Sequence, residues 1–369
     1  LSFNATFAPP EDMLVDHRSL AEAALAKAAR VNPDLGMLHL SLAIHALQIN
    51  RDPERAGVEA QLARRTLPNN AQVEMITGRV ARRQDRWEEA VRCFERAASL
   101  EPRNIEFRIL LNNTYRYLRR YDEQSRVASD VLALVPAAEL KDMQADLAVV
   151  QIERAADLGP YREVIASAVG EEAARFKNKQ GADMFLALWS RDAAASDQAL
   201  SDQGWDMFNV NGVRYPKEWY KALAARIRGD QVTAVQAFTE ARVKIERTMD
   251  RDSYPGKSLS VLAIIDAGLG RKEQAIEEAK RACDLTPFST LNLETPVVRC
   301  NLAVVYAWTD QNDLALAELD KLIDRPAGEN GVFQPTYGDF RLNPLWDPLR
   351  SDPRFDALTR RLAPKNQHP

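Results

Sequence analysis

Long apolar runs, an excess of positive charge and a cysteine framework are all absent from this sequence of 369 residues. No stretch approaches the roughly 20 apolar residues that span a membrane. The 49 lysines and arginines are balanced by 53 acidic residues, which gives a net charge of −4. The broad basic surface of a non-specific nucleic-acid-binding protein is therefore not expected. Cys93, Cys283 and Cys300 form no CxxC pair and predict neither a zinc site nor a disulfide framework.

Catalytic and metal-binding motifs are lacking as well. His39 and His45 lie six residues apart, which places them on different faces of a helix, whereas a helical metal site such as HExxH needs both ligands on one face. No GxSxG nucleophile elbow is present. Gly270 and Lys272 lack the other residues of a phosphate-binding loop. The sequence therefore predicts no enzymatic activity, no cofactor and no metal site.

Glycine and proline are scarce, with 15 and 19 residues, and strong helix formers such as alanine, leucine, glutamate and arginine dominate the chain. This composition predicts a helical protein. The length exceeds that of an ordinary single-core domain and indicates two domains or an elongated array. Arginines alternate with acidic residues along the predicted helices, a pattern that is typical of solvated faces with ion pairs.

A repeated pattern of small and large residues is the main signal. The segment 71–104 reads AQVEMITGRVARRQDRWEEAVRCFERAASLEPRN. Its landmarks are Gly78 in a first helix, Trp87 at the start of a second helix, and then Ala90, Phe94, Ala97 and Pro102. These residues resemble the tetratricopeptide repeat, a pair of antiparallel helices of about 34 residues. In such a pair, small residues lie where backbones approach, and a proline ends the second helix.

The neighbouring segments keep the same register. Ala56, Ala90 and Gln124 follow one another at a constant interval, which equals the length of the tetratricopeptide repeat. The predicted closing prolines recur at almost the same interval: Pro33, Pro68, Pro102 and Pro136. The resemblance implies an all-α, tetratricopeptide-like α-solenoid, in which antiparallel helix pairs stack into a right-handed superhelix. Because one pair cannot bury its apolar face alone, at least three pairs must stack.

The regularity of the repeat divides the chain into four predicted segments. They are an N-terminal repeat array (1–136), irregular helical repeats (137–216), longer C-terminal repeats (217–325) and a capping segment (326–369). In the longer repeats, Ala234, Ala275 and Ala315 are spaced more widely than the corresponding residues of the N-terminal array. We therefore expect extended helices or linking segments in that part of the chain.

Two further predictions concern aromatic residues outside the clear repeats. We expect residues 202–216 to form a long loop, in which Trp205, Phe208 and Tyr215 pack over a helix end. In the cap, an extended path set by Pro344, Pro348 and Pro353 would place four apolar side chains over the last helix pair: Trp346, Leu349, Phe355 and Leu358. Such a layer covers the open apolar end of a solenoid.

The C-terminal part of the chain has a narrower resemblance. The segments RKEQAIEEAKRACDLTPFS, NLAVVYAWTDQNDLALAELDKLID and LNPLWDPLRSDPRFDALTRRL are similar to the end of bacterial signalling proteins. In those proteins a repeat array follows a serine/threonine kinase, a nucleotide cyclase or a winged-helix DNA-binding domain. No motif of such an effector is visible, so the resemblance implies only the sensory or docking part. Because the sequence begins with Leu1 rather than methionine, we expect a fragment of a longer chain.

The first helix of each pair lines the concave face of a tetratricopeptide superhelix, so its residues that are free of packing are candidates for binding. They are Ser41, His45 and Gln48, then Met75, Arg79 and Arg82, then Ile109, Asn113, Arg116 and Tyr117. Arginine and asparagine side chains suit a carboxylate or an extended acidic peptide. The alternative is that the arginines pair with nearby acids: Glu74, Asp85 and Glu106. On the binding interpretation, alanine at Arg79 and Arg116 would leave thermal stability nearly unchanged.

The sequence thus predicts a non-catalytic interaction or docking module of a bacterial signalling protein. Its partner would be a protein or an acidic peptide rather than a nucleic acid. Two alternatives remain open: the substrate-recruiting region of a multidomain kinase or cyclase, and a stand-alone scaffold or chaperone. The cysteine pattern favours a reducing compartment, so we expect a cytoplasmic location, or a periplasmic one if a membrane span lies upstream.

Overall fold

The computed structural model describes residues 11–168, 179–201, 206–210, 213–249, 255–287, 295–326 and 335–364. Over these ranges the chain consists of helices and one antiparallel pair of strands. Consecutive helices pack in pairs, and this confirms the predicted all-α, tetratricopeptide-like solenoid. Contacts divide the chain into two compact units: unit 1 is Leu1–Tyr115 with Asp122–Leu134, and unit 2 is Arg116–Tyr121 with Val135–Pro369. The finer division into four segments stays a prediction.

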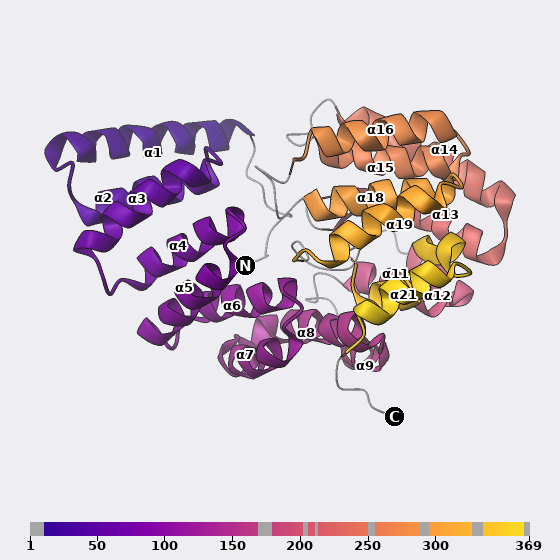
Figure 1. The fold of residues 1–369 in the computed structure, drawn as a ribbon, viewed down its shortest axis with the longest axis horizontal. Coiled ribbons are helices and arrows are strands. Elements are labelled where there is room, and N and C mark those ends of the chain that lie inside the picture. Colours follow the sequence, from indigo (N-terminus) through magenta and orange to yellow (C-terminus); the bar gives the residue numbers. More distant parts are fainter. Residues whose placement is uncertain are drawn as a thin grey trace. The chain divides into compact units, whose positions relative to one another are not determined.

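Unit 1 contains consecutive helices joined by short turns (indigo to purple in Figure 1). They are α1 (Glu11–Val31), α2 (Gly36–Gln48), α3 (Pro53–Thr66), α4 (Ala71–Arg83), α5 (Trp87–Leu100), α6 (Ile105–Tyr117) and α7 (Tyr121–Leu134). The helices α2 and α3 pack as one pair, α4 and α5 as the next, and α3 contacts α4. Gln124 on α7 donates a hydrogen bond of 2.8 Å to Asn112 on α6.

Local sequence signals set the ends of these helices. Asp52 and Asn70 accept hydrogen bonds from backbone amides in the first turns of α3 and α4, as N-cap residues do. The predicted closing prolines each lie two residues beyond a helix: Pro33 after α1, Pro68 after α3, Pro102 after α5 and Pro136 after α7. A proline cannot continue a helix, because it lacks the N–H donor and clashes with the preceding turn.

Small residues lie at the helix contacts that the repeat predicts. Gly78 is buried, and a Cβ atom added to it would lie 2.7 Å from the ring of Phe94 on the paired helix α5. Ala90 and Ala97 of α5 are 0% exposed. The phenyl ring occupies the space that the glycine leaves, so the register predicted for this repeat is confirmed.

Unit 2 is formed by the rest of the chain (magenta to yellow in Figure 1). Its elements are η1 (Ala137–Glu139), α8 (Leu140–Ala155), α9 (Gly159–Ser167), α11 (Lys179–Ser190), α12 (Ala193–Ser201), β1 (Met207–Val210), β2 (Val213–Pro216), α13 (Lys217–Arg228), α14 (Gln231–Met249), α15 (Pro255–Gly268), α16 (Lys272–Asp284), α18 (Thr295–Trp308), α19 (Asn312–Ile323), α20 (Tyr337–Leu342), η2 (Pro344–Leu349) and α21 (Pro353–Arg361). The helix pairs are α8–α9, α11–α12, α13–α14, α15–α16 and α18–α19.

In the longer repeats of unit 2, a glycine again packs against a phenylalanine ring of a neighbouring helix, as Gly78 does in unit 1. A Cβ atom added to Gly268 on α15 would lie 2.7 Å from the ring of Phe238 on α14. The alanines that mark the register, Ala234, Ala275 and Ala315, are at most 1% exposed. Helix α14 therefore packs closely on α15, and the small-residue positions are buried although the repeats are longer.

Residues 207–210 and 213–216 form an antiparallel pair of strands where the sequence predicted a loop. Strand β1 pairs antiparallel with β2, with Phe208 opposite Tyr215. Buried and exposed side chains alternate at the start of β2, but four residues are too short a run to be recognised among helical repeats. Tyr215 is 1% exposed, and its ring packs 5.9 Å from that of Trp219 on α13. Trp205 and the side chain of Phe208 lie outside the described residues.

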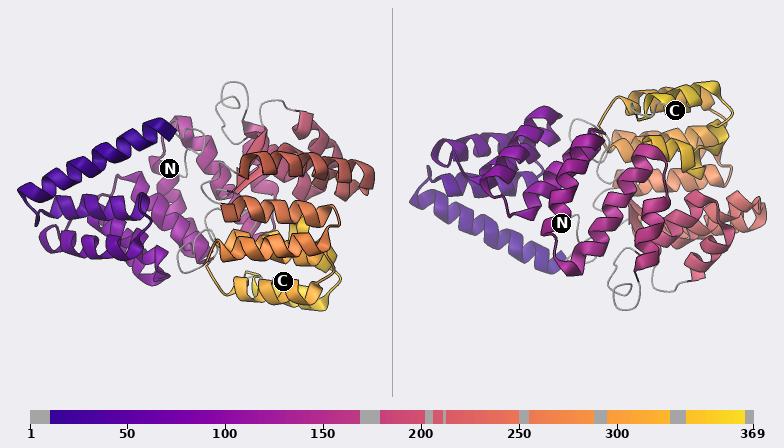
Figure 2. Two further views of the ribbon diagram at one scale, coloured as in Figure 1. Left: turned by 90° about the horizontal axis from the view of Figure 1, so that it is seen from above. Right: turned by 90° about the horizontal axis from the view of Figure 1, so that it is seen from below.

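The C-terminal segment covers the last helix pair. Trp346, Leu349, Phe355 and Leu358 are all at most 8% exposed. Helix α21 contacts α19, and both views of Figure 2 show the two side by side. The predicted extended path is wrong, because Pro344 begins η2 and Pro353 begins α21. A proline with fixed φ suits the first position of a helix.

Helix α20 connects this cap to α8, which lies far away in the sequence. A Cβ atom added to Gly338 would lie 1.8 Å from the carbonyl oxygen of Ile152. Only glycine permits so close an approach of the two backbones. The segment after α19 therefore packs both on the last helix pair and on a helix near the start of unit 2.

Candidate functional site

The predicted binding residues of unit 1 recur at one position of successive first helices. His45, Arg79 and Asn113 lie one repeat length apart, on α2, α4 and α6. All three residues are partly exposed, and Gln48, about one turn after His45, is exposed. We call these four residues the first-helix row. His45, Arg79 and Asn113 share one repeat position, and all four residues are at least partly exposed, which makes them the predicted residues best placed to contact a partner.

Three members of the row already have polar contacts. The Nε2 atom of His45 lies 3.6 Å from a carboxylate oxygen of Glu22. Arg79 donates a hydrogen bond of 2.9 Å to Glu106, one of the pairs that the sequence offered as the alternative to binding. These two side chains are 24% and 34% exposed, and such surface pairs contribute only about 0–1 kcal/mol. A carboxylate from a partner can therefore compete for Arg79. The Oδ1 atom of Asn113 accepts a hydrogen bond of 3.4 Å from Asn112.

The remaining predicted residues of α4 are buried, whereas Ser41 and Ile109 are partly exposed. Met75 and Arg82 are 4% and 7% exposed. The guanidinium group of Arg82 lies 5.8 Å from the ring centroid of Phe94, so this side chain is part of the packing between α4 and α5. Ser41 is partly exposed, and its hydroxyl donates to the carbonyl oxygen of Met37. Ile109 on α6 is also partly exposed.

Arg116 and Tyr117, at the end of α6, are buried with 7% and 4% exposure. Arg116 donates hydrogen bonds of 2.9 and 2.5 Å to the two carboxylate oxygens of Glu153 on α8. Removing one partner of a buried ion pair leaves an uncompensated charge and is strongly destabilising. The structure therefore predicts a large loss of stability for Arg116→Ala, in contrast to the expectation from the sequence.

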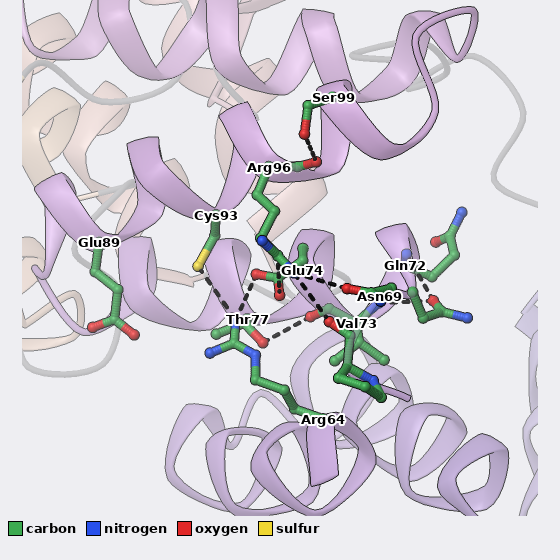
Figure 3. A network of polar contacts seen from close by, with 12 residues as sticks. Arg64, Asn69, Gln72, Val73, Glu74, Thr77, Glu89, Cys93, Arg96 and Ser99 are labelled. Atoms are coloured by element: carbon green, nitrogen blue, oxygen red, sulfur yellow. Dashed lines mark hydrogen bonds and ion pairs between the residues drawn. The ribbon is translucent and has the colours of Figure 1, made fainter. Parts of the chain in front are cut away.

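A buried carboxylate organises the polar contacts between the first repeats (Figure 3). Glu74 on α4 is 4% exposed and pairs with Arg64 of α3 at 2.6 Å and with Arg96 of α5 at 3.3 Å. Arg64 also donates to the Sγ atom of Cys93 at 3.7 Å. Burial raises the pKa of that thiol, so Cys93 remains a neutral thiol. Glu74 thus joins three helices through arginines of the second helices, not through the predicted binding arginines.

The same arrangement recurs in unit 2. Asp266 on α15 is 0% exposed, and it pairs with Arg242 of α14 at 2.8 Å and with Arg271 at 3.2 Å. Glu318 on α19 is 6% exposed and pairs with Arg299 of α18. Several of the many arginines are therefore structural. An arginine that no internal carboxylate holds is more readily available to a partner.

Arg226 meets this condition and was missed in the sequence. It lies at the end of α13 and is exposed, and its side chain makes no ion pair or hydrogen bond among the described residues. Its guanidinium group lies 4.0 Å from the ring centroid of Trp308. The register could have revealed it, because Arg226 precedes Ala234 by eight residues, as Arg82 precedes Ala90. The stacking on Trp308 could not be predicted, since that residue comes from another repeat.

The described residues also bear on metal binding and on membrane crossing. No group of three or more His, Cys, Asp and Glu side chains that could hold a metal ion is found in that part of the chain. None of the helices in the described ranges combines the length and the apolar character needed to cross a bilayer.

No known protein family and no curated protein matches this sequence. The solved structures that are similar to parts of it include two helical proteins. The human IFIT1 dimer with PPP-AAAA shares 17% identity, with 71% of this chain and 57% of that chain covered and a TM-score of 0.36. Naa15/Naa10 bound to HypK-THB shares 13% identity, with 84% and 62% covered and a TM-score of 0.28. The chain thus spans less than two thirds of either structure, and similarity at this level identifies no function.

Proposed function

We propose that this chain is a non-catalytic interaction module that binds a peptide or protein partner through the first-helix row of unit 1. The main support is that partly exposed polar side chains recur at one position of three successive first helices, as His45, Arg79 and Asn113. Side chains that served only packing between helices would be buried there. The guanidinium and amide groups can donate hydrogen bonds to an acidic or extended peptide. His45 contributes ring surface instead, because its Nε2 atom is buried and its Nδ1 atom contacts Asn50.

The spacing of the first helices favours an extended peptide. Helices that pack against each other lie about 8–10 Å apart, and α2 contacts α4. An extended chain in the polyproline II conformation rises about 3.1 Å per residue with three residues per turn, so every third side chain lies on the same face, about 9 Å from the last. A peptide that crosses the first helices would therefore present every third side chain to successive members of the row. Acidic side chains three residues apart would fit Arg79 and its neighbours.

A labelled (Glu-Gly-Gly)4 peptide and its (Gln-Gly-Gly)4 counterpart test this proposal by fluorescence anisotropy. We expect the glutamate peptide to bind and the paired change Arg79→Ala with Asn113→Ala to weaken its binding about tenfold or more, the loss of roughly one charge-assisted hydrogen bond. The melting temperature should change little. Arg55→Ala removes an exposed arginine from α3 and serves as the matched control. Equal affinity of the row variant and this control would contradict the proposal.

We further propose that the module is the docking or sensory part of a bacterial signalling protein. This rests on the resemblance of the C-terminal segment, with Trp346 and Phe355 in its most specific part, to the ends of such proteins. The neighbouring coding sequence in a genome tests it. A kinase, cyclase or winged-helix domain in the same reading frame would support this assignment, and an unrelated catalytic or structural domain there would refute it.

A further inference from the structure

The guanidinium group of Arg226 is held on an aromatic surface in unit 2. It lies 4.0 Å from the ring centroid of Trp308. The indole nitrogen of Trp308 donates a hydrogen bond of 3.0 Å to the carbonyl oxygen of Leu345, which fixes the orientation of the ring. The ring of Trp219 stacks with that of Trp308 at 5.8 Å and 22°. Arg226 is therefore positioned by a rigid aromatic platform, although its side chain is exposed.

The surroundings of Arg226 carry an excess of positive charge. Asp347 accepts hydrogen bonds of 2.8 and 2.6 Å from Arg191 and one of 2.7 Å from Arg350. Burial alone would raise the pKa of Asp347, but these two arginines hold it below its usual value. Burial lowers the pKa of Arg226, and the negative charge of Asp347 opposes that effect. Asp347 is thus shared by two guanidinium groups and acts on a third through its charge, so the cluster can accept a further negative charge.

We propose that Arg226 and Trp308, with Arg191 and Arg350 beside them, form a second binding site that takes a carboxylate of an acidic peptide segment. The planar guanidinium group can bind a carboxylate through two parallel hydrogen bonds. Its position on Trp308 means that little side-chain freedom is lost on binding. Trp308 is itself partly exposed, and tryptophan and arginine are both among the residue types enriched at the energetic centre of protein interfaces.

A comparison of Arg226 with Arg82 distinguishes a binding arginine from one that serves only the packing between helices. Arg82 occupies the same position relative to its repeat, eight residues before Ala90, but it is 7% exposed. Arg226 is an exposed residue, and no carboxylate within the described residues forms an ion pair with it. A nucleic acid is the less favoured occupant, because stable binding of a phosphate backbone needs several contacts along the strand, and this chain has a net charge of −4.

The experiment uses the full chain with Arg79→Ala and Asn113→Ala already introduced, so that the first-helix row is disabled. In this background we expect the labelled (Glu-Gly-Gly)4 peptide to retain measurable binding. Arg226→Gln should weaken that residual binding about tenfold or more, and Arg226→Lys should weaken it less. Arg247→Gln removes an exposed arginine from α14 and should leave the affinity unchanged.

Three outcomes would overturn the proposal. The first is equal affinity of Arg226→Gln and Arg247→Gln. The second is that the disabled background shows no residual binding although the unaltered chain binds the peptide. The first-helix row would then be the only binding site. The third is a 12-nucleotide oligoadenylate that binds and depends on Arg226 while the peptide does not, since this would identify a phosphate ligand. Failure of the row variant alone would refute the proposed function but not this second site.

Discussion

The carboxyl groups of Asp266 and Glu278 interact with each other, but among the described residues only Asp266 forms ion pairs with arginines. The Oδ1 atom of Asp266 accepts hydrogen bonds from Arg242 and Arg271. Its Oδ2 atom and the Oε2 atom of Glu278 are buried without a hydrogen-bond partner among the described residues. Burial raises the pKa of Glu278 to about 7, and the charge of Asp266 adds to that effect. A proton on Glu278 would allow the two carboxyl groups to hydrogen-bond to each other.

We expect this proton to make the free energy of unfolding depend on pH. An acid whose pKa is raised on folding contributes its full stability below its unfolded pKa, and the contribution is lost as the pH rises through the folded pKa. For Glu278 the window runs from 4.5 to about 7. The slope should be smaller than the roughly 1.4 kcal/mol per pH unit of a full proton, because the side chain is partly exposed. Urea denaturation across this window measures it.

Glu278→Gln isolates the effect. The amide can keep the hydrogen bond from Gln274, which now reaches Oε1 at 3.0 Å, and its N–H group can donate to Asp266 in place of the shared proton. The variant should lose the pH dependence and be more stable than the parent above pH 7. Glu277→Gln changes an exposed neighbour and should behave like the parent. If all three proteins give parallel stability curves, the two carboxyl groups do not share a proton.

At the scale of elements, the cap of unit 2 depends on Arg119, in the turn between α6 and α7. Its guanidinium group donates to three carbonyl oxygens: Ile323 at 3.2 Å, Arg325 at 2.7 Å and Pro335 at 2.8 Å. These carbonyl groups lie at the end of α19 and before α20. One arginine thus provides donors for backbone groups on both sides of the connection to the cap.

Arg119→Met should loosen this end of unit 2. The hydrogen bonds from a charged donor are lost and buried carbonyl groups are left without a partner, which we expect to cost on the order of 3 kcal/mol. Amide hydrogen exchange should then accelerate in α20, η2 and α21. Arg341→Met, which changes an exposed arginine within α20, is the control. Unchanged protection of the cap in Arg119→Met would show that the apolar contacts of Trp346 and Phe355 hold it alone.

At the scale of the whole molecule, the division into two compact units predicts that a substitution which destabilises one unit leaves the stability of the other nearly unchanged. Solenoid stability is approximately a sum of repeat and neighbour contributions, so each unit can respond separately. Gly78 and Phe94 lie in unit 1, whereas Arg116 and Glu153 pair within unit 2. These two contacts are buried and of different kinds, and each tests one unit.

Gly78→Leu should overpack unit 1 at a cost of about 1–3 kcal/mol, and Arg116→Ala should destabilise unit 2 by about 3–5 kcal/mol. Hydrogen exchange followed by mass spectrometry assigns the effect to peptides. We expect faster exchange in α2 to α5 for the first variant and in α8 and α9 for the second. Faster exchange over the whole chain in both variants would mean that the protein unfolds as a single unit.

Helical class, repeat register and helix ends were determined by the sequence itself. Gly78, Ala90 and the closing prolines act through short-range sterics, so their spacing along the chain carries the information. The exposed positions of the first helices, such as Arg79 and Asn113, follow from the same register.

The partners of charged and aromatic side chains were decided only by the tertiary structure. The pairing of Arg116 with Glu153, the stacking of Arg226 on Trp308 and the contact of Gly338 with Ile152 all join residues from different repeats. A long side chain can reach several neighbours of suitable charge, and no periodicity distinguishes among them. Which neighbour it meets depends on how the helices pack, and this in turn determines which arginines remain available to a partner.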